Sequence, residues 1–403
     1  MSFQTKKILY SLVFISVFKP NMFNYWNIAD LFSNVFSVLF FLSFSFLFLL
    51  KFLRKHEVNT MTVLIMLIHV VVFLSTFFHH GNFKHWGMAL VSSGTLTLFL
   101  ELHAKDIKNI IKVWFTIVEV FLFVNILTIF TGGISNDDWL TEYFLGSKNT
   151  FEVVFASYLL IIYLNKRFQN RNNYHYIFCY FLMIIAIMST RSSTMLLEFS
   201  IFIILLLCKN NRIIRWVIDY RILLLSFIVL NLLLIVYALN NDLDVITDYL
   251  DYDTDKGSGS FLTRIKMWIA SIDIIKANPI FGIGRMAENT WIAYVGVGDY
   301  KTQLHNQIVE YLVSGGIVLL TILIAVYVLA AHNLHKYRRN SIVVIITLIC
   351  FSLNIANIME AYYNALFYFP FLMTGYLPLV IRNITYQKSK IRQVCVIRRQ
   401  SVI

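Results

Sequence analysis

The sequence predicts an all-α membrane protein: a polytopic bundle of about 12 transmembrane helices with one large extracytoplasmic loop that contains an amphipathic helix. The composition is 58% hydrophobic and only 14% charged, and long apolar runs recur along the 403 residues. Lys and Arg gather in alternate links between those runs. A soluble domain usually carries about 25% charged residues. The chain therefore has more apolar surface than a water-soluble core can bury, and lipid must cover much of it.

The apolar runs define the predicted spans, because a spanning helix needs about 20 apolar residues. We place the spans near 8–19, 31–50, 61–78, 87–103, 113–131, 150–165, 174–189, 194–208, 217–239, 305–331, 341–358 and 362–381. The first run follows Lys6 and Lys7 as in a signal peptide, but no small-residue cleavage site follows it. We interpret it as a retained helix.

The basic residues set the predicted orientation. Of the 34 Lys and Arg residues, 24 lie in one alternating set of links. These residues favour cytoplasmic links, so both termini are predicted to be cytoplasmic. The predicted parts are an N-terminal transmembrane bundle (1–239), a large extracytoplasmic loop (240–304), C-terminal transmembrane helices (305–381) and a basic cytoplasmic tail (382–403). The net charge of +12 then reflects contact with anionic lipid, and no nucleic-acid partner is expected.

The large loop contains a segment, 261–277, with an amphipathic pattern. Its apolar residues recur at helical spacing: Phe261, Ile265, Trp268, Ile272 and Ile275. Asn278-Pro279 ends the helix, because proline disfavours helical angles at the preceding residue. The pattern predicts a helix that lies on the membrane surface or covers the mouth of the bundle.

Ionisable residues at the membrane are costly, and we treat those on the outer side as candidates for function. Arg191 lies in a short polar turn between two spans, where a guanidinium, hydroxyls and free helix N–H groups suit a phosphate. Arg264, one turn into the amphipathic helix, could bind phosphate in the same way. The alternatives are an arginine that caps helix ends and a solvated polar face. Lys266 and Arg285 are weaker candidates of this kind.

His305 begins the first span after the loop, beside Asn306 and with Glu310 five residues later. Imidazole titrates near neutral pH and suits general-base work on a hydroxyl. Asn306 could orient the imidazole or bind a sugar hydroxyl. The alternative is a structural histidine at the membrane interface. Glu198 follows Arg191 by seven residues, and we interpret this spacing as a buried ion pair.

The sequence predicts neither a cofactor nor a metal. It has no glycine-rich nucleotide loop beside a strand and no Asp-x-Asp pair at an outer helix mouth. His79, His80 and His85 share one outer link, but no carboxylate joins them, so a metal site there is disfavoured.

Taken in order, several motifs resemble the bacterial O-antigen ligase and polysaccharide polymerase superfamily. They are Gly146-Ser147-Lys148-Asn149-Thr150, Thr190-Arg191-Ser192, Arg264-x-x-x-Trp268, Asn278-Pro279-Ile280-Phe281-Gly282-Ile283-Gly284, His305-Asn306-x-x-x-Glu310 and Gly315-Gly316. The resemblance covers about 146–316, and the N-terminal spans match only in hydropathy. Thr190 stands where the family often has serine.

The resemblance implies a glycosyltransferase of the bacterial cytoplasmic (inner) membrane with an extracytoplasmic, metal-independent active site. The donor would be an oligosaccharide on undecaprenyl pyrophosphate. Arg191 and Arg264 would bind the pyrophosphate, and His305 would act as the base. Asn306, Glu310, Arg285, Lys266 and Asn149 are expected to support them. A flippase and a chain-length regulator of the same pathway are possible partners.

The function predicted first is a polymerase that joins lipid-linked repeat units of O-antigen, capsule or exopolysaccharide. The short first span followed by Asn24-Tyr25-Trp26-Asn27 favours it. The alternative within the family is an O-antigen ligase, which transfers the finished glycan to lipid A-core. An alternative of another class is a flippase or transporter for lipid-linked oligosaccharides, but that class favours internal repeats, which are not evident. A membrane protein with a structural or sensor role is the third alternative.

Overall fold

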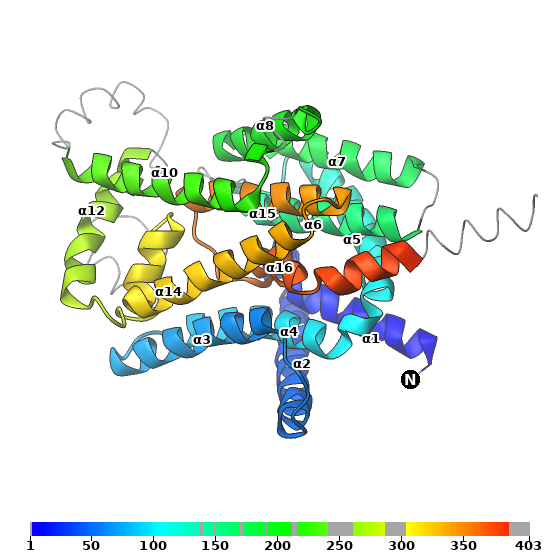
Figure 1. Cartoon of the computed structure of the whole chain (residues 1–403), viewed down its shortest axis with the longest axis horizontal. Helices are drawn as coiled ribbons and strands as arrows, with labels where there is room; N and C mark the ends of the chain where they lie inside the picture. The colour runs from blue at the N-terminus through cyan, green and yellow to red at the C-terminus, as the bar shows by residue number, and fades with distance from the viewer. Residues whose placement is uncertain are drawn as a thin grey trace, which may run out of the picture.

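The computed structural model describes residues 2–137, 140–147, 150–169, 173–190, 192–211, 216–240, 261–286 and 304–386. Over these ranges the protein is a helical bundle (Figure 1). Its longer elements are α1 (Phe3–Val17), α2 (Asn27–Leu53), α3 (Thr60–Phe78), α4 (Phe83–His103), α5 (Ile107–Phe130), α6 (Phe151–Gln169), α7 (Tyr174–Thr190), α8 (Ser193–Cys208), α10 (Tyr220–Asn240), α12 (Phe261–Ala277), α14 (Gln307–Lys336), α15 (Ser341–Met359) and α16 (Ala365–Gly375). Two short 3-10 helices, Asn21–Tyr25 and Ala104–Asp106, join neighbouring helices.

The predicted all-α membrane class is confirmed. Five of the described helical stretches are long and apolar enough to cross a membrane, or six if one bent pair is a single span. Shorter apolar helices cover Tyr174–Thr190, Thr194–Cys208 and Tyr220–Val236. The predicted total of about 12 spans stays a prediction. Most of the predicted loop 240–304 lies outside the described residues, which include only 261–286 and the residue before His305.

Most helices run along the long axis of the molecule, whereas α2 crosses them (Figure 1). Only 11% of the most apolar stretch of α2 is buried, and Ile28 is 85% exposed. This exposed apolar surface suits contact with lipid, because exposing so much of it to water would be unfavourable. The main core lies among α4, α6, α15 and α16, where Leu160, Ile349 and Phe369 are fully buried.

The last predicted span, 362–381, is not one straight helix. The structure has α16 followed by a second helix, Leu377–Tyr386, at an angle of 67°. The break comes at Gly375, whose carbonyl oxygen accepts a hydrogen bond from Asn59 Nδ2 at 2.9 Å. Pro378 follows the break and has no N–H with which to continue the hydrogen bonds of α16, and proline is a common cause of such a kink.

One further element was not expected from the sequence. Strands β1 (Ser135–Asp137) and β2 (Leu140–Glu142) form a short antiparallel pair after α5. The pair is too short to change the helical class.

A second, smaller core lies beneath α12, which has the bounds that the amphipathic pattern predicts. Ile265 and Trp268 of α12 pack there with Leu304, Val309 and Val313 around the start of α14. In Figure 1, α12 stands across the end of the bundle at which α14 begins. Of the two predicted positions for this helix, the structure shows the one over the bundle end.

The turn after α12 is inserted into a break in α14. Gly316 has φ +61° and interrupts the helix. The two hydrogen bonds lost there, from 317 to 313 and from 318 to 314, are replaced by bonds to the turn. Ile317 N donates to Pro279 O (2.9 Å), Val318 N to Ile280 O (3.3 Å), Ile283 N to Val313 O (2.7 Å) and Gly284 N to Ser314 O (3.1 Å). Irregular backbone inside a membrane bundle must be satisfied in this way.

This insertion predicts that Gly282→Ala destabilises the protein by more than ~2 kcal/mol. A Cβ at Gly282 would lie 2.3 Å from Val313 O, and the residue has φ +61°. Gly87→Ala in α4 is the matched control, because a Cβ there meets nothing within 4 Å and alanine favours a helix. Thermal unfolding of both variants in the same detergent tests the prediction, and equal stabilities would contradict it.

Candidate active site

One carboxylate, Glu360, joins the two strongest candidates of the large loop. Its Oε2 lies 2.7 Å from His305 Nδ1, and its Oε1 accepts a hydrogen bond from Arg264 Nη2 at 2.9 Å. The three side chains are mostly buried, with exposures of 14% for His305, 14% for Arg264 and 5% for Glu360. The structure therefore brings together an imidazole and a guanidinium that are 41 residues apart in the sequence.

The local sequence explains the position of Glu360. Helix α15 ends at Met359, and Glu360 takes an extended conformation (φ −143°, ψ 159°) while its N–H still bonds Ala356 O. The Met359 carbonyl is one of the helix-end groups that no helical N–H can satisfy. Arg264 Nη1 donates to it at 2.7 Å. Arg264 therefore caps the C-terminal end of α15 and also pairs with Glu360.

His305 has a left-handed backbone, with φ +52°. Such angles are uncommon for residues other than glycine and persist only where the surroundings enforce them. Trp268 Nε1 donates to Leu304 O at 2.7 Å, and Leu304 N donates to Glu310 Oε2 at 3.1 Å. The tryptophan of the Arg264-x-x-x-Trp268 motif thus fixes the backbone just before His305.

Asn306 follows on the other side of His305 and is fully buried. Its Oδ1 caps α14 by accepting from Ile308 N (3.0 Å) and Val309 N (3.1 Å). Its Nδ2 donates to Asn231 Oδ1 and Ile358 O. This geometry gives Asn306 a capping role at the start of α14, and its amide nitrogen bonds the Asn231 side chain and the backbone of Ile358.

Glu310 and Arg285 form the second ion pair near His305. Arg285 Nη1 donates to Glu310 Oε1 at 2.6 Å, and both side chains are largely buried. The Arg285 guanidinium also lies over the ring of Tyr363, 4.5 Å from its centroid. Glu310 therefore holds Arg285 with one oxygen and the backbone before His305 with the other.

The segment after α15 is fixed against the start of α14. Gln307 Nε2 donates to Tyr362 O at 3.0 Å, and Tyr362 N donates to Gln307 Oε1 at 2.7 Å. This pairing of the Gln307 side chain with the Tyr362 backbone helps to set Glu360 and His305 side by side. The Tyr362 hydroxyl continues the network by donating to Glu152 Oε2 at 3.2 Å.

Glu152, in the first turn of α6, extends the site toward the turn that contains position 191. Ser192, which caps α8, donates to Glu152 Oε1 at 3.3 Å. Glu152 also interacts electrostatically with Glu360 and Arg264. Arg191 itself lies outside the described residues. Its described neighbour Ser192 belongs to the same network as His305.

Three other predicted residues have limited description. Asn149 lies outside the described residues, and so does the side chain of Lys266. Glu198 is fully buried, and within the described part of the chain neither carboxyl oxygen has a hydrogen-bond partner. The predicted pairing of Glu198 with Arg191 stays a prediction.

Glu360 and Glu152 are the residues that the sequence did not single out for the site. Glu360 lies in the predicted outer link 359–361 after an apolar run, and nothing in its spacing points to His305. The signal that could have found it is the cost of a carboxylate at that depth, which implies a cationic partner.

The arrangement suits base catalysis beside an anion. Glu360 can accept a hydrogen bond from the Nδ1–H of a neutral His305. In that tautomer the Nε2 lone pair is free to take a proton. Among the described residues, Nε2 has no hydrogen-bond partner. Arg264 has five N–H donors, and its hydrogen bonds to Met359 O and Glu360 Oε1 use one at Nη1 and one at Nη2.

Comparison with known protein families gives a match over part of the chain. The family model described as O-Antigen ligase matches residues 178–324. The match includes Arg191, Arg264, Arg285, His305, Asn306 and Glu310, whereas Glu152 and Glu360 lie outside it. No curated protein matches the chain. The match over 178–324 supports a relationship of this region to the O-antigen ligase and polysaccharide polymerase superfamily.

Proposed function

We propose that this membrane enzyme is a polysaccharide polymerase that joins repeat units carried on undecaprenyl pyrophosphate at the outer face of the cytoplasmic membrane. The observation that carries the proposal is the single carboxylate, Glu360, that bonds both His305 and Arg264. A base for a hydroxyl and a cation for a phosphate then act at one place, as transfer from a sugar diphosphate requires.

The reaction is a displacement at the anomeric carbon of the donor sugar. The acceptor hydroxyl oxygen forms the new bond to that carbon and gives its proton to His305 Nε2. The bond from the carbon to the diphosphate oxygen breaks, and the electron pair leaves with the lipid diphosphate. The leaving group gains negative charge, which Arg264 stabilises, with Arg191 as a second candidate.

Glu360 acts in this scheme by positioning His305. Glu360→Gln is expected to lower the rate of transfer by about 100-fold or more, because the amide N–H₂ can bond Nδ1 and favour the wrong tautomer. The drop should appear in kcat more than in KM, and Glu360→Asp should restore part of it. Glycan transfer by purified protein measures both.

Glu119→Gln provides the matched control for that variant. Glu119 also bonds a histidine, His175 Nδ1 at 2.9 Å, but His175 is 70% exposed. Transfer by this variant should equal that of the wild type. If both glutamines had equal effects, the positioning role of Glu360 would be wrong.

The ligase reaction is the second candidate, favoured by the description of the matched family model. Deletion of the protein in its own host, followed by a gel of surface glycans, separates the two. Loss of a polymerase leaves single repeat units on the acceptor, whereas loss of a ligase leaves long chains on the lipid carrier. An unchanged glycan pattern would contradict both reactions.

A further inference from the structure

A large cavity lies at the opposite end of the same helices from His305. It has a volume of about 1450 Å³ and is lined by α6, α7, α8, α15 and the end of α14. Helices α6, α8 and α14 begin at the candidate active site and end at this cavity, whereas α15 runs in the reverse direction. The basic end of the cavity is therefore separate from the candidate active site, whereas its apolar part reaches Phe155, one turn after Glu152.

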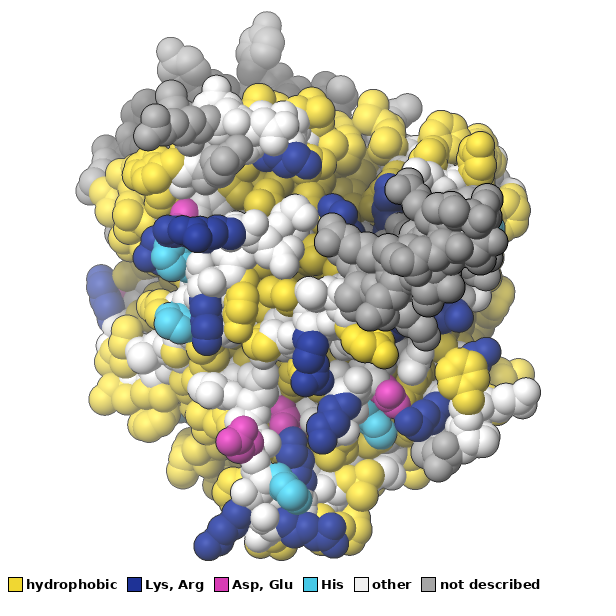
Figure 2. Space-filling model, turned by 45° about the vertical axis from the view of Figure 1, so that its right-hand side comes forward, with side chains coloured by type: hydrophobic (Ala, Val, Ile, Leu, Met, Phe, Trp, Pro, Cys, Tyr) yellow, Lys and Arg dark blue, Asp and Glu magenta, His cyan; other side chains and the backbone are white. Residues whose placement is uncertain are grey.

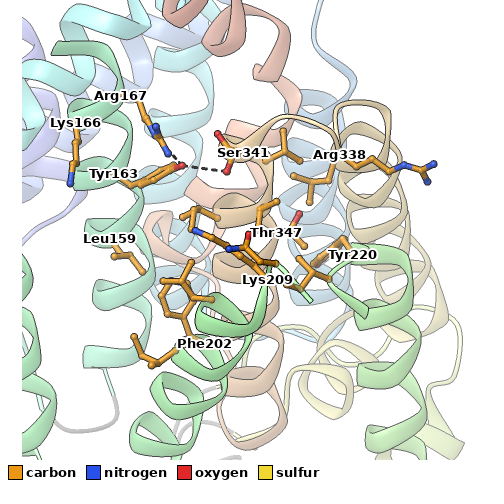
Figure 3. Close-up of a pocket in the computed structure, with 18 of the residues that line it drawn as sticks. Leu159, Tyr163, Lys166, Arg167, Phe202, Lys209, Tyr220, Arg338, Ser341 and Thr347 are labelled. Carbon is orange, nitrogen blue, oxygen red and sulfur yellow. Dashed lines mark hydrogen bonds between the residues drawn. The ribbon is translucent and has the colours of Figure 1, made fainter. Parts of the chain in front are cut away.

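The lining divides into an apolar part and a basic rim. Phe155, Leu159, Phe199 and Phe202 line the apolar part, and the rings of Phe155 and Phe199 pack edge to face with centroids 5.8 Å apart. The basic rim consists of Lys166, Arg167, Lys209, Arg338 and Arg339. In Figure 3, Lys209 lies near the middle of the cavity beside Thr347, and Arg167 points toward Tyr163, while Arg338 points away.

Only part of the positive charge of the rim is neutralised within the described chain, by the ion pair of Arg338 Nη1 with Asp219 Oδ2 at 3.8 Å. Asp219 is the one acidic residue of the lining, and it already bonds Arg221 at 2.9 Å and His335 at 2.8 Å. Partial burial raises the pKa of Asp219, but the hydrogen bonds from Arg221 and His335 outweigh burial and hold that pKa below its usual range. Lys166, Arg167 and Lys209 make no ion pair with any described carboxylate.

The rim lies at the end that the charge pattern predicts to be cytoplasmic. Figure 2 shows many Lys and Arg side chains spread over the face that includes the right-hand end of Figure 1. Trp216, which is 68% exposed, lines the cavity at this end. An exposed tryptophan beside basic residues is typical of the level of lipid headgroups.

We propose that this cavity binds an anionic glycerophospholipid, with its phosphate at Lys166, Arg167 and Lys209 and its acyl chains in the apolar part. The volume exceeds the ~300–1,000 Å³ of small-molecule pockets, as two hydrocarbon chains require. Basic pockets between transmembrane helices suit such headgroups. The charge decides the occupant, because a zwitterionic lipid would leave the rim without a counter-charge. This site does not depend on the proposed transfer reaction.

The test uses the purified full-length protein in detergent micelles with added phosphatidylglycerol. Bound lipid is counted by native mass spectrometry, and the thermal unfolding midpoint is followed. The triple variant Lys166→Gln, Arg167→Gln, Lys209→Gln should need about tenfold or more phosphatidylglycerol for the same occupancy. The control Arg54→Gln, Lys55→Gln, Lys105→Gln removes the same charge from exposed residues outside the cavity and should bind as the wild type does.

Leu159→Trp is a second variant that keeps every charge and fills the apolar part. It should lose phosphatidylglycerol even if the triple variant fails to fold. Equal binding by the triple variant and its control would overturn the proposal. Equal binding of phosphatidylcholine and phosphatidylglycerol by the wild-type protein would also overturn it. The same holds if the lipid lost from the Leu159→Trp variant proves to be a polyprenyl diphosphate.

Discussion

Replacing His305 with alanine is expected to lower glycan transfer by about 10²–10⁴-fold, the usual contribution of a general base. The imidazole lies beside Glu360, which also bonds Arg264, and its Nε2 has no hydrogen-bond partner among the described residues, so it is our candidate for the base that takes the proton of the acceptor hydroxyl. The loss should fall mainly on kcat, because the base acts in the transition state. Transfer by purified protein under saturating donor and acceptor measures it.

His332→Ala is the matched control for that variant. His332 lies on the same helix, α14, but on its exposed surface near the other end. Its transfer rate and unfolding midpoint should stay at the wild-type values. If His305→Ala keeps both its fold and its transfer rate, His305 is not the base.

The second large effect is expected at Arg264. Arg264→Ala should lower kcat by about 10²–10³-fold, the range for loss of one preorganised group that stabilises developing charge. Arg264→Lys should have an intermediate rate, since lysine keeps the charge but loses the planar fork that bonds both Met359 O and Glu360. Lys276→Ala, on the exposed side of α12, should leave transfer unchanged.

Stability must be separated from catalysis in this series. Arg264→Ala leaves the Glu360 carboxylate buried without its guanidinium, and breaking a buried pair costs about 3–5 kcal/mol. The double variant Arg264→Ala, Glu360→Gln removes that carboxylate and should recover much of the unfolding midpoint. Its transfer should stay low. Recovery of transfer together with stability would mean that Arg264 acts only on the fold.

Hydropathy and spacing were sufficient for the helices. Every predicted span except the last, 362–381, overlaps one described helix, and the bounds of α12 follow from its apolar spacing and Asn278-Pro279. The period of a helix is a local property, so a single sequence carries it. Gly375 and Pro378 mark the bend in the local sequence, whereas the contact of Gly375 with Asn59, more than 300 residues away, is not a local property.

The site was predictable in its chemistry but not in its connections. The sequence predicted His305 and Arg264 as site residues, because an ionisable side chain at the membrane is costly unless it has a function. It could not show that Glu360 joins them, since this contact depends on how α12, α14 and α15 meet. The sequence also suggested that Asn306 binds a sugar hydroxyl. In the structure its Oδ1 caps the buried start of α14 by accepting from Ile308 N and Val309 N. The motifs Gly282-Ile283-Gly284 and Gly315-Gly316 likewise meet in the structure, where the turn after α12 is inserted into the break in α14. Their spacing in the sequence does not predict this contact.

Transfer by the purified protein in liposomes tests the central claim most directly. The donor is a repeat unit on undecaprenyl pyrophosphate, a chelator is present, and products are separated by size on a gel. We predict a ladder of longer lipid-linked glycans with the wild-type protein and none above background with His305→Ala. Absence of transfer with a folded wild-type protein, or an equal ladder with His305→Ala, would contradict the claim.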